Sequence, residues 1–203
     1  MSPSEHLVGA DHALLAPSAD LAQAYDLIAA FATPNRVVAG HRAFILDFVT
    51  AHPDALVRTC LDGHLTGSGM VVDDAGVRVL LMHHAKLDRW LQPGGHADGD
   101  ANLASVALRE ATEETGISDL LIDPDPADLD VHPIPARGAE PAHWHLDVRF
   151  LVRAPRSAKM LGNDESLELR WFTPSEVGTV DPDGELSRLV DAALERANGA
   201  DPV

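Results

Sequence analysis

The segment between Gly94 and Gly116 constrains the fold more than any other part of the sequence. It begins with a Gly-Gly turn, continues with helical periodicity, and ends in Arg109-Glu110-Ala111-Thr112-Glu113-Glu114. We expect Asp100 to cap a helix that runs from about residue 101 to 115, with Gly116 at the position where glycine commonly ends a helix. The three glutamates therefore fall in the last turn of one helix.

These glutamates repel one another unless a cation lies between them. At about 100° per residue they fall within an arc of about 100°. Each pair of like charges costs on the order of 3 kcal/mol before salt screening, and the negative end of the helix dipole adds a second penalty. Carboxylate oxygens suit Mg²⁺ or Mn²⁺, so the pattern predicts a metal site; a solvated acidic helix end is the alternative. We expect Arg109 to bond Glu113, which leaves Glu110 and Glu114 facing a common point.

Residues around the turn are candidates for substrate binding. Gly94 and Gly95 allow the backbone to approach a ligand closely, and their N–H groups can meet a phosphate. Lys86 is one of the few cations nearby and is a candidate phosphate contact. Trp90 is expected either to stack on a base or to pack on the core. Arg149 is expected to contact substrate or to pair with Asp147.

The segment from Gly95 to Ile117 resembles the Nudix box, Gly-x5-Glu-x7-Arg-Glu-U-x-Glu-Glu-x-Gly-U, in which U is a bulky aliphatic residue. The sequence departs from this pattern at Ala101, where the box has Glu, and at Ala111, which is small for the first U. Asp98 and Asp100 are close enough in sequence to compensate for the missing glutamate. The box residues present are Gly95, Arg109, Glu110, Glu113, Glu114, Gly116 and Ile117.

The resemblance extends over about residues 63 to 177 and implies an α/β fold, an α/β/α sandwich with a mixed sheet. It implies a Nudix domain at residues 63–203, preceded by an N-terminal helical segment at 1–62. It also implies Mg²⁺- or Mn²⁺-dependent hydrolysis of a nucleoside diphosphate derivative. By analogy Glu110 and Glu114 bind metal, Glu113 binds metal or activates water, and Arg109 holds the glutamates. The catalytic residues expected are therefore Arg109, Glu113 and Glu114.

Histidines form a second pattern. His96 follows the glycine turn, and alternation in a strand puts His143, His145 and Asp147 on one face. Such a set can form a mixed N/O metal site, although eleven histidines also cluster by chance. The sequence is similar here to type I isopentenyl diphosphate isomerase, which has Gly-His at the box start and two alternating metal ligands on a strand. That resemblance implies a metal centre of His96, His143 and His145 besides the glutamates, and it favours Mn²⁺ over Mg²⁺.

Periodicity predicts the remaining elements. Helices are expected at residues 20–32, 40–51 and 185–197, with a short one starting at 173–176. Strands are expected at 65–73, 77–83, 145–154 and 167–172, and the Pro- and Asp-rich stretch 123–141 is expected to be an exposed loop. Glu165, in the loop before the last strand, is a further candidate ligand or base. Interleaved strands and helices predict a mixed sheet covered by helices.

Composition narrows the partners. The formal net charge of −17 disfavours nucleic acid and anionic membranes, so we expect a small phosphate-containing substrate. The absence of a basic, then apolar N-terminal stretch argues against a signal peptide, and the single cysteine, Cys60, fits a cytoplasmic protein. A homodimer is possible. Two alternatives stay open: an isopentenyl-diphosphate-isomerase-like enzyme, which Gly94 disfavours because the isomerase has its nucleophilic cysteine there, and a catalytically weak nucleotide-binding or sensor protein, which Ala101 favours.

Overall fold

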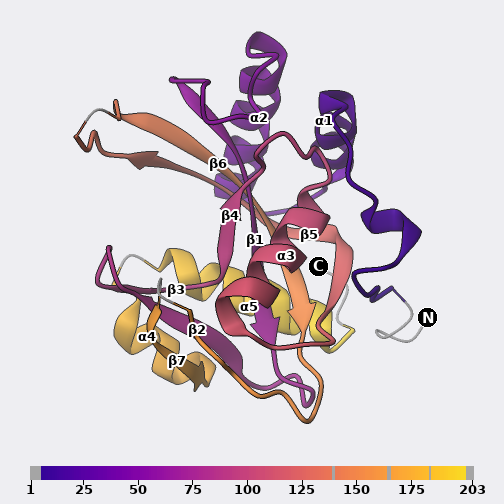
Figure 1. Cartoon of the computed structure of the whole chain (residues 1–203), viewed down its shortest axis with the longest axis vertical. Helices are drawn as coiled ribbons and strands as arrows, with labels where there is room; N and C mark the ends of the chain where they lie inside the picture. The colour runs from indigo at the N-terminus through magenta and orange to yellow at the C-terminus, as the bar shows by residue number, and fades with distance from the viewer. Residues whose placement is uncertain (1–5, 139, 164–165, 183, 200–203) are drawn as a thin grey trace.

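A mixed seven-stranded sheet organises the molecule (Figure 1). The structure is a computed structural model that describes residues 6–138, 140–163, 166–182 and 184–199. The elements, in chain order, are the 3₁₀ helix η2 (Ala13–Leu15), α1 (Leu21–Ala30), α2 (Arg36–Ala51), β1 (Gly63–Val72), β2 (Val79–His84), β3 (Arg89–Leu91), β4 (Gly94–His96), α3 (Leu103–Thr115), β5 (Leu121–Ile134), β6 (His143–Arg153), β7 (Ser166–Phe172), α4 (Pro174–Val180) and α5 (Glu185–Ala197).

Strand β1 lies at the centre of the sheet. It pairs with β6 in parallel over ten residue pairs, and with β2 and β4 in antiparallel. The strand order is β3-β2-β1-β6-β5, and β7 pairs with β2 outside this path. The mixed sheet confirms the predicted fold class.

The two faces of β1 meet different helices. Gly67 faces α3, because a Cβ placed on it would lie 2.7 Å from the Leu103 carbonyl oxygen. On the other face, Met70 and Val72 pack against Leu189 and Val190 of α5. Since side chains alternate along a strand, His64, Thr66 and Ser68 lie on the α5 face of the sheet, beyond the apolar contact with that helix.

Helix α3 begins later than predicted. Its N-cap is Asn102, whose side chain accepts a hydrogen bond from the Ser105 N–H at 3.3 Å. Asp100 does not cap the helix because its carboxylate accepts from the backbone N–H groups of Ser18 and Asn102 instead. The predicted end is confirmed: Gly116 has φ of 64° and closes the helix.

The N-terminal helices are close to those predicted. Helix α2 starts earlier than expected because Asn35 caps it, accepting from the N–H groups of residues 37 and 38. Ile28 of α1 and Ile45 of α2 are fully buried in the same apolar cluster as Leu65 of β1. Among the described residues, no helix is long and apolar enough to cross a membrane.

The loop predicted at residues 123–141 is largely wrong. Strand β5 occupies Leu121–Ile134 and pairs with β6 along most of its length, with register shifts near Pro126. Asp128 and Asp130, which suggested an exposed loop, are buried. Their charges are compensated by arginines from β6 and α5, so they remain inside the fold.

Candidate active site

The glycine turn lies against the C-terminal half of α3. The Gly94 N–H donates to Glu114 Oε2 at 3.0 Å. At Gly95 there is no room for a side chain, because a Cβ would lie 2.4 Å from Cδ of Glu110. At Gly94 a Cβ would lie 2.4 Å from Cβ of Ser68. The two glycines therefore let β4 fit between β1 and α3, a structural requirement that the sequence alone did not reveal.

Arg109 bonds a different glutamate from the one predicted. Its Nη2 donates to Glu110 Oε1 at 2.9 Å, whereas Glu113 acts on Arg109 only through its charge, which helps to raise the pKa of Arg109. The same Nη2 lies 3.5 Å from the His96 carbonyl oxygen. Burial alone would lower the pKa of Arg109, but the Glu110 hydrogen bond and nearby negative charges raise it. Arg109 therefore holds Glu110 toward β4.

The three carboxylates differ in exposure, which suits different tasks. Glu114 is buried, Glu110 is half-buried, and Glu113 is exposed to solvent. Hard carboxylate oxygens grouped in one helical turn against a backbone held close by glycine fit a divalent cation such as Mg²⁺ or Mn²⁺. Glu110 and Glu114 could hold such a cation on the side facing β4, and Glu113 could meet a water molecule.

The missing glutamate at position 101 is not compensated by its neighbours. Ala101 is fully buried, so the position belongs to the core rather than to the site. Asp98 forms two 2.8 Å hydrogen bonds with Arg58, and this side-chain bond lowers the pKa of Asp98. Asp100 is engaged with backbone N–H groups of Ser18 and Asn102. The suggestion that Asp98 or Asp100 replaces the absent ligand is therefore wrong.

The other predicted substrate contacts lie on β3 and the turn before it. Lys86 is exposed in the β2–β3 turn. Trp90 packs on the protein: its ring stacks on His83 at 5.1 Å and meets Phe172 edge-on at 4.9 Å. For Trp90 the structure thus favours the packing alternative over base stacking. Glu165, the candidate loop carboxylate, lies outside the described residues.

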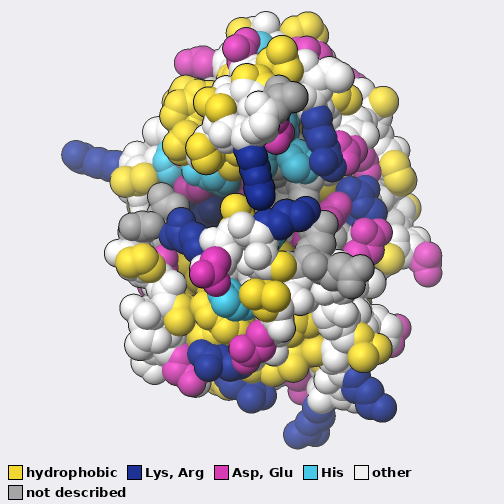
Figure 2. Space-filling model, turned by 60° about the vertical axis from the view of Figure 1, so that its left-hand side comes forward, with side chains coloured by type: hydrophobic (Ala, Val, Ile, Leu, Met, Phe, Trp, Pro, Cys, Tyr) yellow, Lys and Arg dark blue, Asp and Glu magenta, His cyan; other side chains and the backbone are white. Residues whose placement is uncertain are grey.

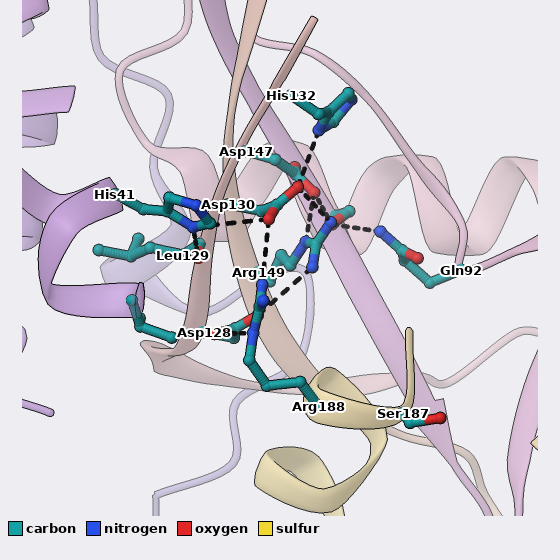
Figure 3. A network of polar contacts seen from close by, with 12 residues as sticks. His41, Gln92, Asp128, Leu129, Asp130, His132, Asp147, Arg149, Ser187 and Arg188 are labelled. Carbon is teal, nitrogen blue, oxygen red and sulfur yellow. Dashed lines mark hydrogen bonds and ion pairs between the residues drawn. The ribbon is translucent and has the colours of Figure 1, made fainter. Parts of the chain in front are cut away.

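Arg149 is buried in an ionic network and not presented to a ligand (Figure 3). Its Nε donates to Asp147 at 2.8 Å, its Nη2 to Asp130 at 2.9 Å, and its Nη1 to Asp128 at 3.3 Å. Arg188 of α5 bonds Asp128 and Asp130 from the other side. Burial would lower the pKa of Arg149, but the aspartates raise it well above its ordinary value. The substrate contact predicted for Arg149 is replaced by a structural role.

The predicted histidines do come together, but on the other side of β4 from the glutamates. Successive residues of a strand point to opposite faces, so Gly95 meets Glu110 while His96 points away from it. The ring of His96 lies 4.9 Å from that of His145, and His143 lies 5.2 Å from His145. The single centre of histidines and glutamates expected from the sequence is therefore divided between the two faces of the sheet. Figure 2 shows histidine side chains gathered in a hollowed area, with Lys and Arg at its rim.

Burial favours the neutral form of His96 and of His145. It lowers the pKa of His96 to about 4 and that of His145 to about 2, and neighbouring positive groups act in the same direction. Burial lowers the pKa of His64 as well. Neutral imidazole is the form that binds metals.

His64 is the member of this group that sequence reasoning missed. Its ring lies 4.8 Å from both His96 and His143, because His64 pairs with His145 in the parallel β1–β6 register. The polar alternation of His64, Thr66 and Ser68 in an otherwise apolar strand was the signal that could have revealed it.

The carboxylates grouped beside the glycine turn fit a hydrolase that acts on phosphoanhydride bonds with divalent metal ions. Residues 63–190 match the family described as the NUDIX domain. The chain belongs to the Nudix family, and it is a Nudix hydrolase.

Solved structures share this fold. The Ap4A hydrolase of C. elegans, in a binary complex, is 19% identical with a TM-score of 0.52 over 63% of this chain and 93% of that chain. The dihydroneopterin triphosphate pyrophosphohydrolase of E. coli is 15% identical with a TM-score of 0.50, over 68% of this chain and 96% of that chain. At these identities the likeness concerns the fold alone.

Proposed function

We propose that this chain hydrolyses a diphosphate linkage in a small nucleoside diphosphate derivative, such as ADP-ribose or another nucleotide sugar, or in a nucleotide. The observation that carries the proposal is the arrangement of Glu110, Glu113 and Glu114 around the glycine turn of β4, with Glu110 against Gly95 and Glu114 on the Gly94 N–H. The net charge of −17 supports a small substrate, since phosphate can approach only where a cation reverses the local field.

Each residue has a distinct task in this proposal. Glu110 and Glu114 bind Mg²⁺ or Mn²⁺, and Arg109 keeps the Glu110 carboxylate in place. Such a cation polarises the phosphate and lowers the pKa of the attacking water. Glu113, which is exposed, accepts the proton as water attacks phosphorus, and the P–O bond to the leaving phosphate breaks. Gly94 and Gly95 keep β4 close to the carboxylates of Glu110 and Glu114, and Lys86 contacts the phosphates of the substrate.

The first experiment replaces Glu114 with Gln in the full chain and assays a panel at saturating Mn²⁺ and Mg²⁺. The panel contains ADP-ribose, a second nucleoside diphosphate sugar, a nucleoside triphosphate and isopentenyl diphosphate. We expect Glu114→Gln to lower kcat/KM by on the order of 100-fold or more, because an amide cannot replace a charged metal ligand. Asp74→Asn, an exposed change in the β1–β2 turn, is the control. An unchanged rate in Glu114→Gln contradicts the assignment, and turnover of isopentenyl diphosphate alone would indicate the isomerase-like alternative.

A second candidate function is a nucleotide sensor with the Nudix fold, which binds its nucleotide without hydrolysing it. The observation that favours it is Ala101, which is fully buried and leaves the box one carboxylate short. Tight binding of ADP-ribose by calorimetry, with no phosphate release at saturating Mn²⁺, would identify the sensor. Hydrolysis of a substrate in the panel, which we expect, excludes the sensor.

A further inference from the structure

Beyond the proposed hydrolysis, the face of the sheet opposite α3 holds a group of histidines for which that reaction has no use. Three strands contribute to it: His64 from β1, His96 from β4 and His145 from β6. One ring nitrogen from each lies within 4.8 Å of the others. The ring centroids are separated by 4.8, 4.9 and 5.0 Å. These residues are far apart in sequence, so the sheet register alone brings them together.

The ring of His64 lacks the hydrogen bonds that a buried imidazole normally makes. His64 is 3% exposed, yet neither of its nitrogens has a hydrogen-bond partner of normal geometry. The backbone of Cys60 lies near the ring and raises the pKa of His64, against the lowering by burial, but it does not make a hydrogen bond of normal geometry. A buried polar atom without a partner is costly and rare in native proteins. A buried ring with neither nitrogen paired, and with one nitrogen within 4.8 Å of a nitrogen of His96 and of His145, indicates that something else completes the group.

His143 offers a fourth nitrogen beside this group, because its ring lies 4.8 Å from that of His64 and 5.2 Å from that of His145. Its Nδ1 lies 3.0 Å from the Pro141 carbonyl oxygen, which can only accept, so Nδ1 carries the proton. The lone pair is then on Nε2, which is buried and without a hydrogen bond; the Glu140 carboxylate is 3.9 Å away. A histidine that donates one N–H to a carbonyl and offers the other nitrogen is the usual arrangement of a metal ligand.

We propose that His64, His96 and His145 bind a transition-metal ion of the Zn²⁺ class, with His143 as the fourth nitrogen. Imidazole nitrogens favour Zn²⁺, Co²⁺, Ni²⁺ and Cu²⁺ over Mg²⁺. A tetrahedral Zn²⁺ with Zn–N distances of about 2.0–2.1 Å needs its nitrogens roughly 3.3 Å apart, so nitrogens that now lie within 4.8 Å of one another close in by up to about 1.5 Å on binding. Arg58, whose charge lowers the pKa of His96, is bidentately paired with Asp98, whose charge acts in the opposite direction.

This site is separate from the carboxylates that serve hydrolysis. His96 and Gly95 are adjacent on β4 and point to opposite faces, the glycine toward Glu110. Hard oxygens on one face select Mg²⁺ or Mn²⁺, and nitrogens on the other select Zn²⁺. The histidine site therefore does not depend on the proposed function.

The test measures metal binding by the full chain after removal of metals with a chelator. Calorimetry with Zn²⁺ gives stoichiometry and affinity, and Co²⁺ gives the visible d–d bands of tetrahedral nitrogen coordination. We expect one high-affinity Zn²⁺ per chain, intense Co²⁺ bands that Zn²⁺ abolishes, and a rise in Tm of about 5 °C or more with excess Zn²⁺. Mg²⁺ should not displace Co²⁺. Absence of the Co²⁺ bands in the wild-type protein overturns the proposal without any variant having to fold.

Variants locate the site. His96→Gln and His145→Gln should each weaken Zn²⁺ binding by about 100-fold, while the exposed His6→Gln leaves it unchanged. Glu114→Gln should bind Zn²⁺ like the wild type even though it fails to hydrolyse substrate. Zn²⁺ binding that survives both cluster variants, or that is lost in Glu114→Gln, contradicts a separate histidine site.

Discussion

At the scale of single residues, the lack of a side chain at Gly95 sets how closely β4 approaches α3. The Glu110 carboxylate occupies the space in which a Cβ would lie, and Arg109 fixes that carboxylate from the other side. Position 95 therefore determines where the Glu110 carboxylate lies, although it contributes no functional group of its own.

Gly95→Ala should separate catalysis from stability. The added methyl group displaces only the end of the Glu110 side chain, so we expect the free energy of unfolding to change by less than about 1 kcal/mol. We expect kcat/KM to fall by about 10- to 100-fold, because a ligand displaced by about an ångström no longer matches the reacting geometry. Gly40→Ala in α2 is the matched control, since a Cβ there has open space. Full activity in Gly95→Ala would show that the position of Glu110 is not critical.

Arg109 illustrates what the sequence could and could not predict about the site. Helical spacing correctly placed the glutamates in one turn and ended the helix at Gly116. It also favoured a pair between Arg109 and Glu113, four residues apart. The bond goes to Glu110 because β4, a different part of the chain, offers the His96 carbonyl oxygen beside it. The helical periodicity of residues 103–115 carries no information about this contact with β4.

At the scale of elements, the β1–β2 hairpin depends on one carboxylate. Asp73 Oδ1 accepts from the N–H groups of Val77 and Arg78, at 2.9 and 3.1 Å, and Oδ2 accepts from Arg78 Nε at 2.9 Å. Burial would raise the pKa of Asp73, but these bonds lower it below the ordinary 3.8. The carboxylate form is thus favoured by the folded hairpin.

Asp73→Asn should therefore destabilise the protein in a pH-dependent way. Because the folded pKa is depressed, the contribution of Asp73 is complete above about pH 3.8 and is lost as pH falls through the folded pKa. We expect a loss of about 1–3 kcal/mol at pH 7 that narrows below pH 4, measured by urea unfolding across this range. Asp74→Asn, on an exposed neighbour, should show neither effect. A difference that is constant with pH would contradict this role of the charge.

Strand β5 shows why one long element was mispredicted; the three-residue strands β3 and β4 were not predicted either, and the other elements were close to expectation. Most helices and strands follow from apolar periodicity, which short stretches of sequence contain. In β5 the buried side chains include Asp123, Asp128 and Asp130, and the strand also carries Pro126. These residues read as a loop unless their partners are known, and the partners are Arg149, Arg188 and Arg196, which follow later in the chain.

At the scale of the whole molecule, the buried network joins β5, β6 and α5 on the face opposite α3 (Figure 3). It lies between the apolar contacts of α5 and the histidine group, and Asp147 also accepts from Thr66 and Ser68 of β1. Three buried carboxylates are compensated by the buried Arg149 and the half-buried Arg188. Removing Arg149 leaves these carboxylates with only part of that compensation.

Arg149→Met should cost about 3–5 kcal/mol of unfolding free energy, the range expected when one partner of a buried ionic set is lost. Thermal and urea unfolding of the full chain measure it. Arg36→Met, an exposed change at the start of α2, is the comparison and should stay within about 0.5 kcal/mol of wild type. A shift of comparable size in both variants would show that the network does not contribute as described.

The three-residue strand β4 has one further consequence. It is aligned with β1 by the pairs Thr66–His96, Gly67–Gly95 and Ser68–Gly94. Sliding it by one position would drive an imidazole into the space reserved for Glu110 and turn a glycine toward the histidines. A single inserted or deleted residue beside Pro93 would therefore disrupt both the contact with Glu110 and the histidine group. A point substitution on β4 would disrupt only one of them. The length of this short segment is thus under tighter constraint than the identity of most residues around it.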